Sequence, residues 1–207
     1  MPSPVVDARG AGCALYYVPD GFETRGRKRL MGRHAAGESF LRGLALHLTA
    51  PQMGAAVPGP EAADHLRARF RDWTARPAID AFRHDDLAGL SRHGVLMRPD
   101  PHIAREAWPR QRASRFAYAL CGVTHTISSE GALDAIADLA SAPLEPHDAL
   151  ICTSRAVRVA VDAMLERVCS QLADRYGGRP PELPMRPVIP LGIHADDFTV
   201  LADVRQA

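Results

Sequence analysis

A histidine with polar neighbours follows one of the longest apolar runs of this chain. The stretch FAYALCGVTHT (116–126) predicts a buried strand, with His125 and Thr126 at its carboxyl end. Open parallel sheets hold their ligands at this end of the strands. An imidazole there can exchange hydrogen bonds or a proton with a ligand near neutral pH. We therefore predict that His125 contacts a ligand. The alternative is a histidine that is satisfied within the core.

Gly37 and Glu38 come just before the apolar stripe of a predicted helix. In AGESFLRGLALHL (36–48) the apolar residues recur at helical spacing, beginning at Phe40. Backbone N–H groups at the start of a helix can bind a phosphate. Gly37 and Glu38 are therefore candidates for phosphate binding. The alternative is that Gly37 permits close packing and that Glu38 complements the helix dipole.

A local basic run, RGRKRLMGRH (25–34), separates the first predicted strand from this helix. A positive loop at the edge of a sheet attracts anionic substrates, and it would also suit lipid head groups at a membrane surface. Arg33 and His34 lie nearest to the helix and are the best candidates for substrate contact. The alternative is a solvated basic loop.

Other residues with reactive side chains have spacings that favour structural roles. His84, Asp85 and Asp86 are metal-ligand types, as are Asp100 and His102, but their spacing favours loop capping, so we predict no metal. The four cysteines form no CxxC motif, which favours buried free thiols. No GxGxxG follows the first strand, and both the phosphate loop of nucleotide hydrolases and the GxSxG motif of serine hydrolases are missing.

Strands and helices alternate along most of the sequence. Predicted strands cover 13–19, 94–99, 116–126, 148–154 and 187–193, and predicted helices begin near residues 36, 60, 130 and 154. Ser154 is expected to cap the longest helix, which ends at Gly177 and Gly178. This alternation predicts an α/β fold: a Rossmann-like open parallel sheet with helices on both faces.

Length and charge exclude several classes of protein. A chain of 207 residues can bury the core of one domain, and its net charge of +1 is too low for a general nucleic-acid binder. No apolar run is long enough to span a bilayer, and the first residues lack the pattern of a secretion signal. These features predict a cytoplasmic protein.

Three segments together resemble a known family. VIPLGIHADDF (188–198) resembles the IP-x-G-(V/I)-(D/H)…F segment that joins the two domains of group 1 retaining glycosyltransferases with the GT-B fold. DALICTSRAV (148–157) is similar to the strand and helix start that precede this segment in the family. AAGESFLRGLALHL (35–48) resembles the glycine loop and first helix of the family's N-terminal domain.

The resemblance implies that residues 1–187 form the N-terminal, acceptor-side domain and that 188–207 form the crossing into a donor-binding C-terminal domain. Gly192 is expected at a turn of this crossing with a positive φ. The implied reaction transfers a sugar from a nucleotide-sugar donor to an acceptor, without a cofactor. His125 would be catalytic and Gly37 and Glu38 would approach the donor diphosphate. Arg33, His34 and Thr126 would contact the acceptor.

A second reading comes from a different class of function. The same α/β sheet would also suit a non-catalytic module that presents its strand ends to a nucleotide or a protein partner. A second series of strands and helices carrying a paired-glutamate motif would favour the enzyme over the module.

Overall fold

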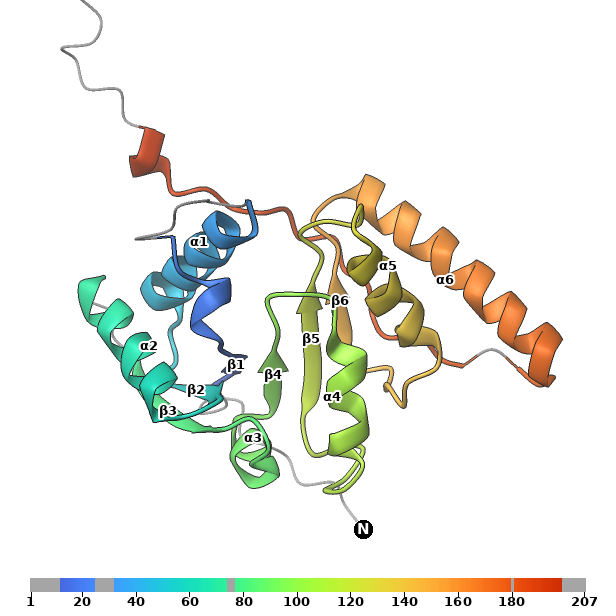
Figure 1. The fold of residues 1–207 in the computed structure, drawn as a ribbon, viewed down its shortest axis with the longest axis horizontal. Helices are drawn as coiled ribbons and strands as arrows, with labels where there is room; N and C mark the ends of the chain where they lie inside the picture. The colour runs from blue at the N-terminus through green and yellow to red at the C-terminus, as the bar shows by residue number, and fades with distance from the viewer. Residues whose placement is uncertain (1–11, 25–31, 74–76, 180, 199–207) are drawn as a thin grey trace, which may run out of the picture.

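Six parallel strands form one open sheet in the order β3-β2-β1-β4-β5-β6 (Figure 1). The computed structural model describes residues 12–24, 32–73, 77–179 and 181–198. The strands are β1 (Ala14–Tyr16), β2 (Gln52–Val57), β3 (Ala78–Arg83), β4 (Val95–Met97), β5 (Ala119–Val123) and β6 (Ala149–Ile151). The predicted Rossmann-like parallel sheet is therefore confirmed.

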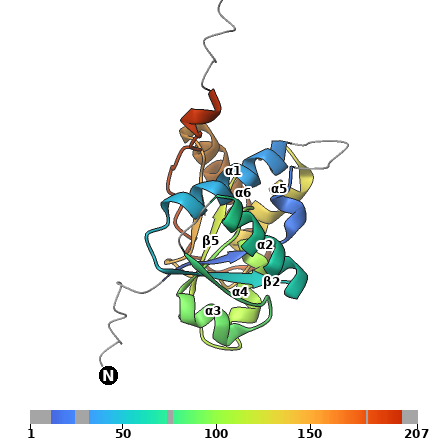
Figure 2. The ribbon, with the colours of Figure 1, turned by 90° about the vertical axis from the view of Figure 1, so that its left-hand side faces the viewer.

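Helices cover both faces of this sheet, as predicted. They are α1 (Gly32–His47), α2 (Pro60–Asp72), α3 (Leu87–His93), α4 (Ile103–Arg110), α5 (Glu130–Ala137) and α6 (Arg155–Tyr176), with short 3-10 turns η1 (Pro19–Gly21), η2 (Asp138–Ala140) and η3 (Ala195–Phe198). One apolar cluster joins α1 and α2 to the sheet, and it includes Leu15, Leu41 and Leu66. A second cluster packs helices α3, α4, α5 and α6 against the sheet, through residues such as Leu90 and Leu165. Figure 2 shows the α1 and α2 side.

The structure contains two strands and two helices that the sequence patterns do not predict. The segment 50–60 is rich in proline, glycine and alanine and carries no strand signal, yet it contains β2, the strand that pairs with both β1 and β3. Gly54 of β2 is required by packing, because a Cβ there would lie only 2.5 Å from the ring of His93. The strand β3 and the helices α3 and α4 were not predicted either.

The long helix α6 forms as the sequence predicts. The Ser154 side chain accepts a hydrogen bond from the amide of Val157 at 3.1 Å, which caps the first turn. Gly177 and Gly178 follow the last turn with φ values of 71° and 101°. Only glycine adopts such angles without strain, so both ends of this helix are specified locally.

The start of α1 is a correction. The helix begins at Gly32, earlier than predicted, so Gly37 and Glu38 lie inside it. Gly37 instead allows α1 to approach η1, because a Cβ at this position would lie 2.1 Å from the carbonyl oxygen of Gly21. The packing role considered for Gly37 therefore has direct support.

The C-terminal segment, residues 185–198, runs along the edge of the sheet next to β6 and then crosses to α1 (Figure 1). The strand predicted at 187–193 is not continuous. Only two isolated parallel bridges form, between Met185 and Ala149 and between Val188 and Cys152. Prolines interrupt the pairing because they lack an N–H donor. The positive φ predicted for Gly192 is wrong, since its φ lies outside that region.

A buried ion pair ties the second half of the sheet together. Arg110 of α4 and Asp148, just before β6, are both fully buried and form two hydrogen bonds of 2.6 and 2.8 Å. Asp148 also accepts the amides of Leu120 and Glu145. The pair therefore fixes α4, β5 and the loop before β6 relative to one another.

Candidate functional site

The order of the strands reverses between β1 and β4, and this places a candidate site at the carboxyl edge of the sheet. After β1 the chain turns to the face covered by α1, whereas after β4 it turns to the face covered by α4. Loops that leave neighbouring strands in opposite directions open a crevice in which α/β proteins hold ligands. Side chains from the ends of β1, β3, β4 and β5 converge near this point.

A stack of three side chains lies at this edge. The imidazole of His84, after β3, stacks on the ring of Tyr16 at the end of β1, with a centroid separation of 4.2 Å. The guanidinium of Arg98, after β4, lies 3.9 Å from the centroid of the same Tyr16 ring. The three side chains therefore form a continuous platform across the ends of three strands, which sequence spacing alone did not indicate.

The charge of Arg98 is compensated within the protein. Arg98 donates two hydrogen bonds of 2.9 Å to Asp100 and a further one to Glu106. Burial lowers the pKa of Arg98, but the bonds and charges of these carboxylates outweigh it and raise the pKa above its ordinary value. For Asp100, burial raises the pKa, but the hydrogen bonds and charge of Arg98 outweigh burial and bring the pKa below its usual range. Arg98 and Asp100 are therefore both ionised at neutral pH.

His125 follows β5 at the same edge, as predicted. Both of its ring nitrogens are buried, and neither forms a well-aligned hydrogen bond with another described residue. Burial lowers the pKa of His125, and the Pro99 carbonyl and the Asp100 charge offset only part of this effect. A neutral imidazole results, with one donor and one acceptor nitrogen, and contact with a ligand would require the residues that cover these nitrogens to move. Thr126 beside it is exposed, and its hydroxyl lies 2.9 Å from that of Ser128.

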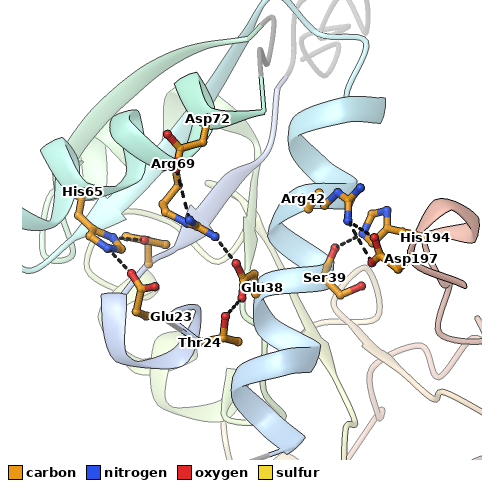
Figure 3. Close-up of polar contacts among 11 residues, drawn as sticks. Glu23, Thr24, Glu38, Ser39, Arg42, His65, Arg69, Asp72, His194 and Asp197 are labelled. Atoms are coloured by element: carbon orange, nitrogen blue, oxygen red, sulfur yellow. Dashed lines mark hydrogen bonds and ion pairs between the residues drawn. The ribbon is translucent and has the colours of Figure 1, made fainter. Parts of the chain in front are cut away.

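Glu38 belongs to a polar network that links α1 to α2 and to the segment after η1. It accepts hydrogen bonds from the hydroxyl of Thr24 and from the guanidinium of Arg69, as Figure 3 shows. Arg69 also contacts Asp72 at 3.4 Å and lies over the ring of Trp73. The basis of the predicted phosphate contact, a helix start at Gly37 and Glu38, is therefore wrong. Whether these residues bind a phosphate stays a prediction.

A second chain of hydrogen bonds holds the segment after β1 against α2. The hydroxyl of Tyr17 lies 2.7 Å from Nδ1 of His65, and Nε2 of His65 lies 2.7 Å from a carboxylate oxygen of Glu23 (Figure 3). Burial, followed by the charge of Glu23, raises the pKa of Tyr17, so its phenol stays protonated. These residues are far apart in the sequence, and no local pattern indicated their contact.

Two other predicted contact residues lie at the start of α1. His34 is fully buried, so contact with an acceptor would require this part of α1 to rearrange. Arg33 belongs to α1, but its side chain lies outside the described residues, as does the basic segment 25–31. The roles predicted for Arg33, His34 and Thr126 stay predictions.

The described residues give little support for metal or thiol chemistry. Within the described ranges, no group of three or more histidine, cysteine, aspartate or glutamate side chains could hold a metal ion. The cysteines are free, and burial raises the pKa of Cys121 to about 11, which keeps its thiol protonated. No helix in the described part of the chain is both long and apolar enough to cross a membrane.

Comparisons with protein families, with curated proteins and with solved structures gave no match to this chain. The site itself and the resemblance of short segments are therefore the features that bear on function.

Proposed function

We propose that this chain forms the acceptor-side domain of a retaining glycosyltransferase, which transfers a sugar from a nucleotide-sugar donor to an acceptor. The observation that carries the proposal is the position of His125, at the carboxyl end of β5 and one strand away from the reversal of strand order. The resemblance of residues 188–198 to the family's crossing segment gives separate support.

His125 would act through hydrogen bonds to the transferred sugar. Its imidazole is neutral at physiological pH because burial lowers its pKa. A neutral imidazole can orient a sugar hydroxyl, and its remaining lone pair can stabilise positive charge that develops at the anomeric carbon. The hydroxyl of Thr126 lies in the same loop and would contact the acceptor. The donor diphosphate would be held mainly by a second domain across the cleft.

The test uses protein expressed from the complete reading frame. The purified protein is incubated with UDP-, GDP- and ADP-sugars and a panel of acceptors, and release of the nucleoside diphosphate is measured. His125→Ala should lower turnover by about 10²-fold or more, as expected for a positioned catalytic group. His147→Ala, at a partly exposed histidine away from this edge, is the control and should retain full activity.

Two results would contradict the proposal. If no donor gives nucleoside diphosphate, the proposed glycosyltransferase activity is contradicted. Full activity in folded His125→Ala protein would remove His125 from the site and leave it as a core histidine.

The second candidate function is a non-catalytic binding module. It is favoured by the ion pairs around Arg98, because Arg98, Asp100 and Glu106 compensate one another and leave no net positive charge there for a phosphate. A folded protein that neither releases nucleoside diphosphate nor binds a nucleotide sugar would support this alternative, with a protein as the partner.

A further inference from the structure

Two adjoining cavities lie between α1 and the C-terminal segment. The first, which we call the apolar chamber, has a volume of about 500 Å³ and is lined by Ala36, Ser39, Phe40, Gly43, Leu44, His47, Leu48, Leu191, Gly192, Ile193 and His194. The second, which we call the polar chamber, has a volume of about 280 Å³ and is lined by Thr24, Ala35, Glu38, Ser39, Arg42, Trp73, His194 and Asp197. Ser39 and His194 line both chambers, so the chambers adjoin.

The apolar chamber is suited to a hydrocarbon chain. Phe40, Leu44 and Leu48 of α1 form one wall, and Leu191 and Ile193 form part of the other. Leu191 and Ile193 are 54% and 74% exposed, so the C-terminal segment keeps apolar surface in contact with water. A ligand that covers this surface would gain the free energy of its burial. The volume lies within the range of about 300–1,000 Å³ typical of small-molecule sites.

The polar chamber contains a cation held by a replaceable partner. Arg42 of α1 contacts the carboxylate of Asp197 at 2.8 and 3.0 Å, and His194 donates a hydrogen bond from Nε2 to the carbonyl of Ser39 at 3.1 Å (Figure 3). The Asp197 side chain is 52% exposed. Exposed ion pairs contribute little to stability, so an external anion can take the place of Asp197.

The other charges of the polar chamber do not oppose an anion. Among the described residues of its lining, Glu38 is the remaining carboxylate, and Arg69 and Thr24 already bind it. Replacement of Asp197 by an incoming anion leaves the charge around Arg42 unchanged. The chamber therefore accepts one negative head group without a net electrostatic penalty.

We propose that the two chambers together bind a single-chain amphiphilic anion, such as an alkyl phosphate or a fatty acid, as a free molecule. Its hydrocarbon tail occupies the apolar chamber, and its phosphate or carboxylate pairs with Arg42 in place of Asp197. Neither lining includes Tyr16, His84, Arg98 or His125, and the proposal does not depend on glycosyl transfer.

Binding can be measured with dodecyl phosphate and the fluorescence of Trp73. Trp73 lines the polar chamber, and the chain has one other tryptophan, Trp108, which is 60% exposed. The Trp108→Phe protein therefore reports on this chamber alone. Dodecyl phosphate, kept below its micelle concentration, should change the emission in a saturable manner. Inorganic phosphate and dodecanol, which each supply one half of the ligand, should bind about tenfold more weakly or worse.

Substitutions in the Trp108→Phe protein separate the two chambers. Arg42→Gln should weaken dodecyl phosphate binding by about tenfold or more, because a charge-assisted bond is lost. Asp197→Asn should tighten it by about twofold to fivefold, because the competing carboxylate is removed. Gly43→Leu should abolish binding by filling the apolar chamber, since a Cβ at Gly43 meets nothing within 4 Å. Gly131→Leu in α5, also unobstructed, is the matched control.

Several outcomes would overturn the proposal. They are unchanged binding by Gly43→Leu, weaker binding by Asp197→Asn, and equal binding of dodecanol and dodecyl phosphate. Binding to vesicles of anionic phospholipid without any response to free dodecyl phosphate would assign this surface to a membrane instead. A circular dichroism melt of each variant, with the fold of Gly131→Leu as reference, excludes unfolding as the cause of lost binding.

Discussion

At the scale of single residues, the histidines of the carboxyl edge show how burial sets chemistry. His84 and His125 follow different strands, and desolvation lowers the pKa of both. Each can thus serve as an uncharged hydrogen-bonding group at physiological pH, where an exposed histidine would be partly charged. The sequence indicated His125 because a strand precedes it, whereas His84 was assigned to a loop cap.

This shift of pKa predicts an acid-sensitive stability. A group whose pKa is lower in the folded state stabilises the fold above its unfolded pKa, near 6.5 for histidine, and loses that contribution as pH falls toward its folded pKa. The free energy of unfolding should therefore decrease between about pH 7.5 and about pH 5. In His125→Gln the decrease should be smaller, as measured by urea denaturation.

A matched substitution distinguishes this effect from general acid sensitivity. His147→Gln changes a histidine that is 38% exposed and is the control for the loss of one histidine. A His125→Gln variant with the same pH dependence as wild type would show that His125 does not contribute.

At the scale of elements, the Arg110 and Asp148 pair is the strongest link between α4 and the strands β5 and β6. Four hydrogen bonds converge on the Asp148 carboxylate from Arg110, Leu120 and Glu145. Arg110 and Leu120 are remote from Asp148 in the sequence, and Glu145 is separated from it by a turn. Neither helical nor strand periodicity therefore predicts these contacts. The position of the pair between elements shows that it specifies their arrangement.

Asp148→Asn should therefore destabilise the protein strongly. The substitution leaves the buried guanidinium of Arg110 without its counter-charge, and breaking a buried pair in this way costs about 3–5 kcal/mol. Urea denaturation should show this loss in the free energy of unfolding. Asp64→Asn removes one partner of the exposed pair with Arg67 and should change stability by about 0.5 kcal/mol or less. Similar stabilities for the two variants would contradict a structural role for the buried pair.

At the scale of the whole molecule, the C-terminal segment links β6, at one edge of the sheet, to α1. Its first part is bonded to β6 through the backbone, since the amides of Met185 and Ile189 donate to the carbonyls of Asp148 and Cys152 at 2.8 and 3.0 Å. Its last part contacts α1 through side chains, chiefly by the Asp197 pair with Arg42. The segment is thus held by backbone hydrogen bonds next to β6 and by side-chain contacts next to α1.

Hydrogen exchange should resolve this change along the segment. The amides of Met185 and Ile189 should exchange slowly, at rates approaching those of β6, because they belong to its backbone pairing. The amides of Leu191 and Ile193 should exchange much faster, since no backbone hydrogen bond from either occurs among the described residues. Equal protection of both parts would indicate a continuous seventh strand and would contradict this difference between the two parts.

The sequence by itself determined the class of the fold and the ends of its best-defined helix. Apolar runs such as 116–126 and amphipathic segments such as 155–176 carry periodic signals that depend on near neighbours only. Ser154, Gly177 and Gly178 act through their own backbone and adjacent residues, so their roles could be assigned without a structure.

The tertiary structure alone decided the central strand β2, the start of α1 and the partners of the candidate site. Gly54, Ala55 and Ala56 have little preference for a strand, and β2 forms because β1 and β3 pair with it on both sides. Glu38 meets Arg69 across 31 positions of the chain, and Arg42 meets Asp197 across 155. Such contacts depend on how the elements pack in space, and local sequence patterns carry no information about that packing.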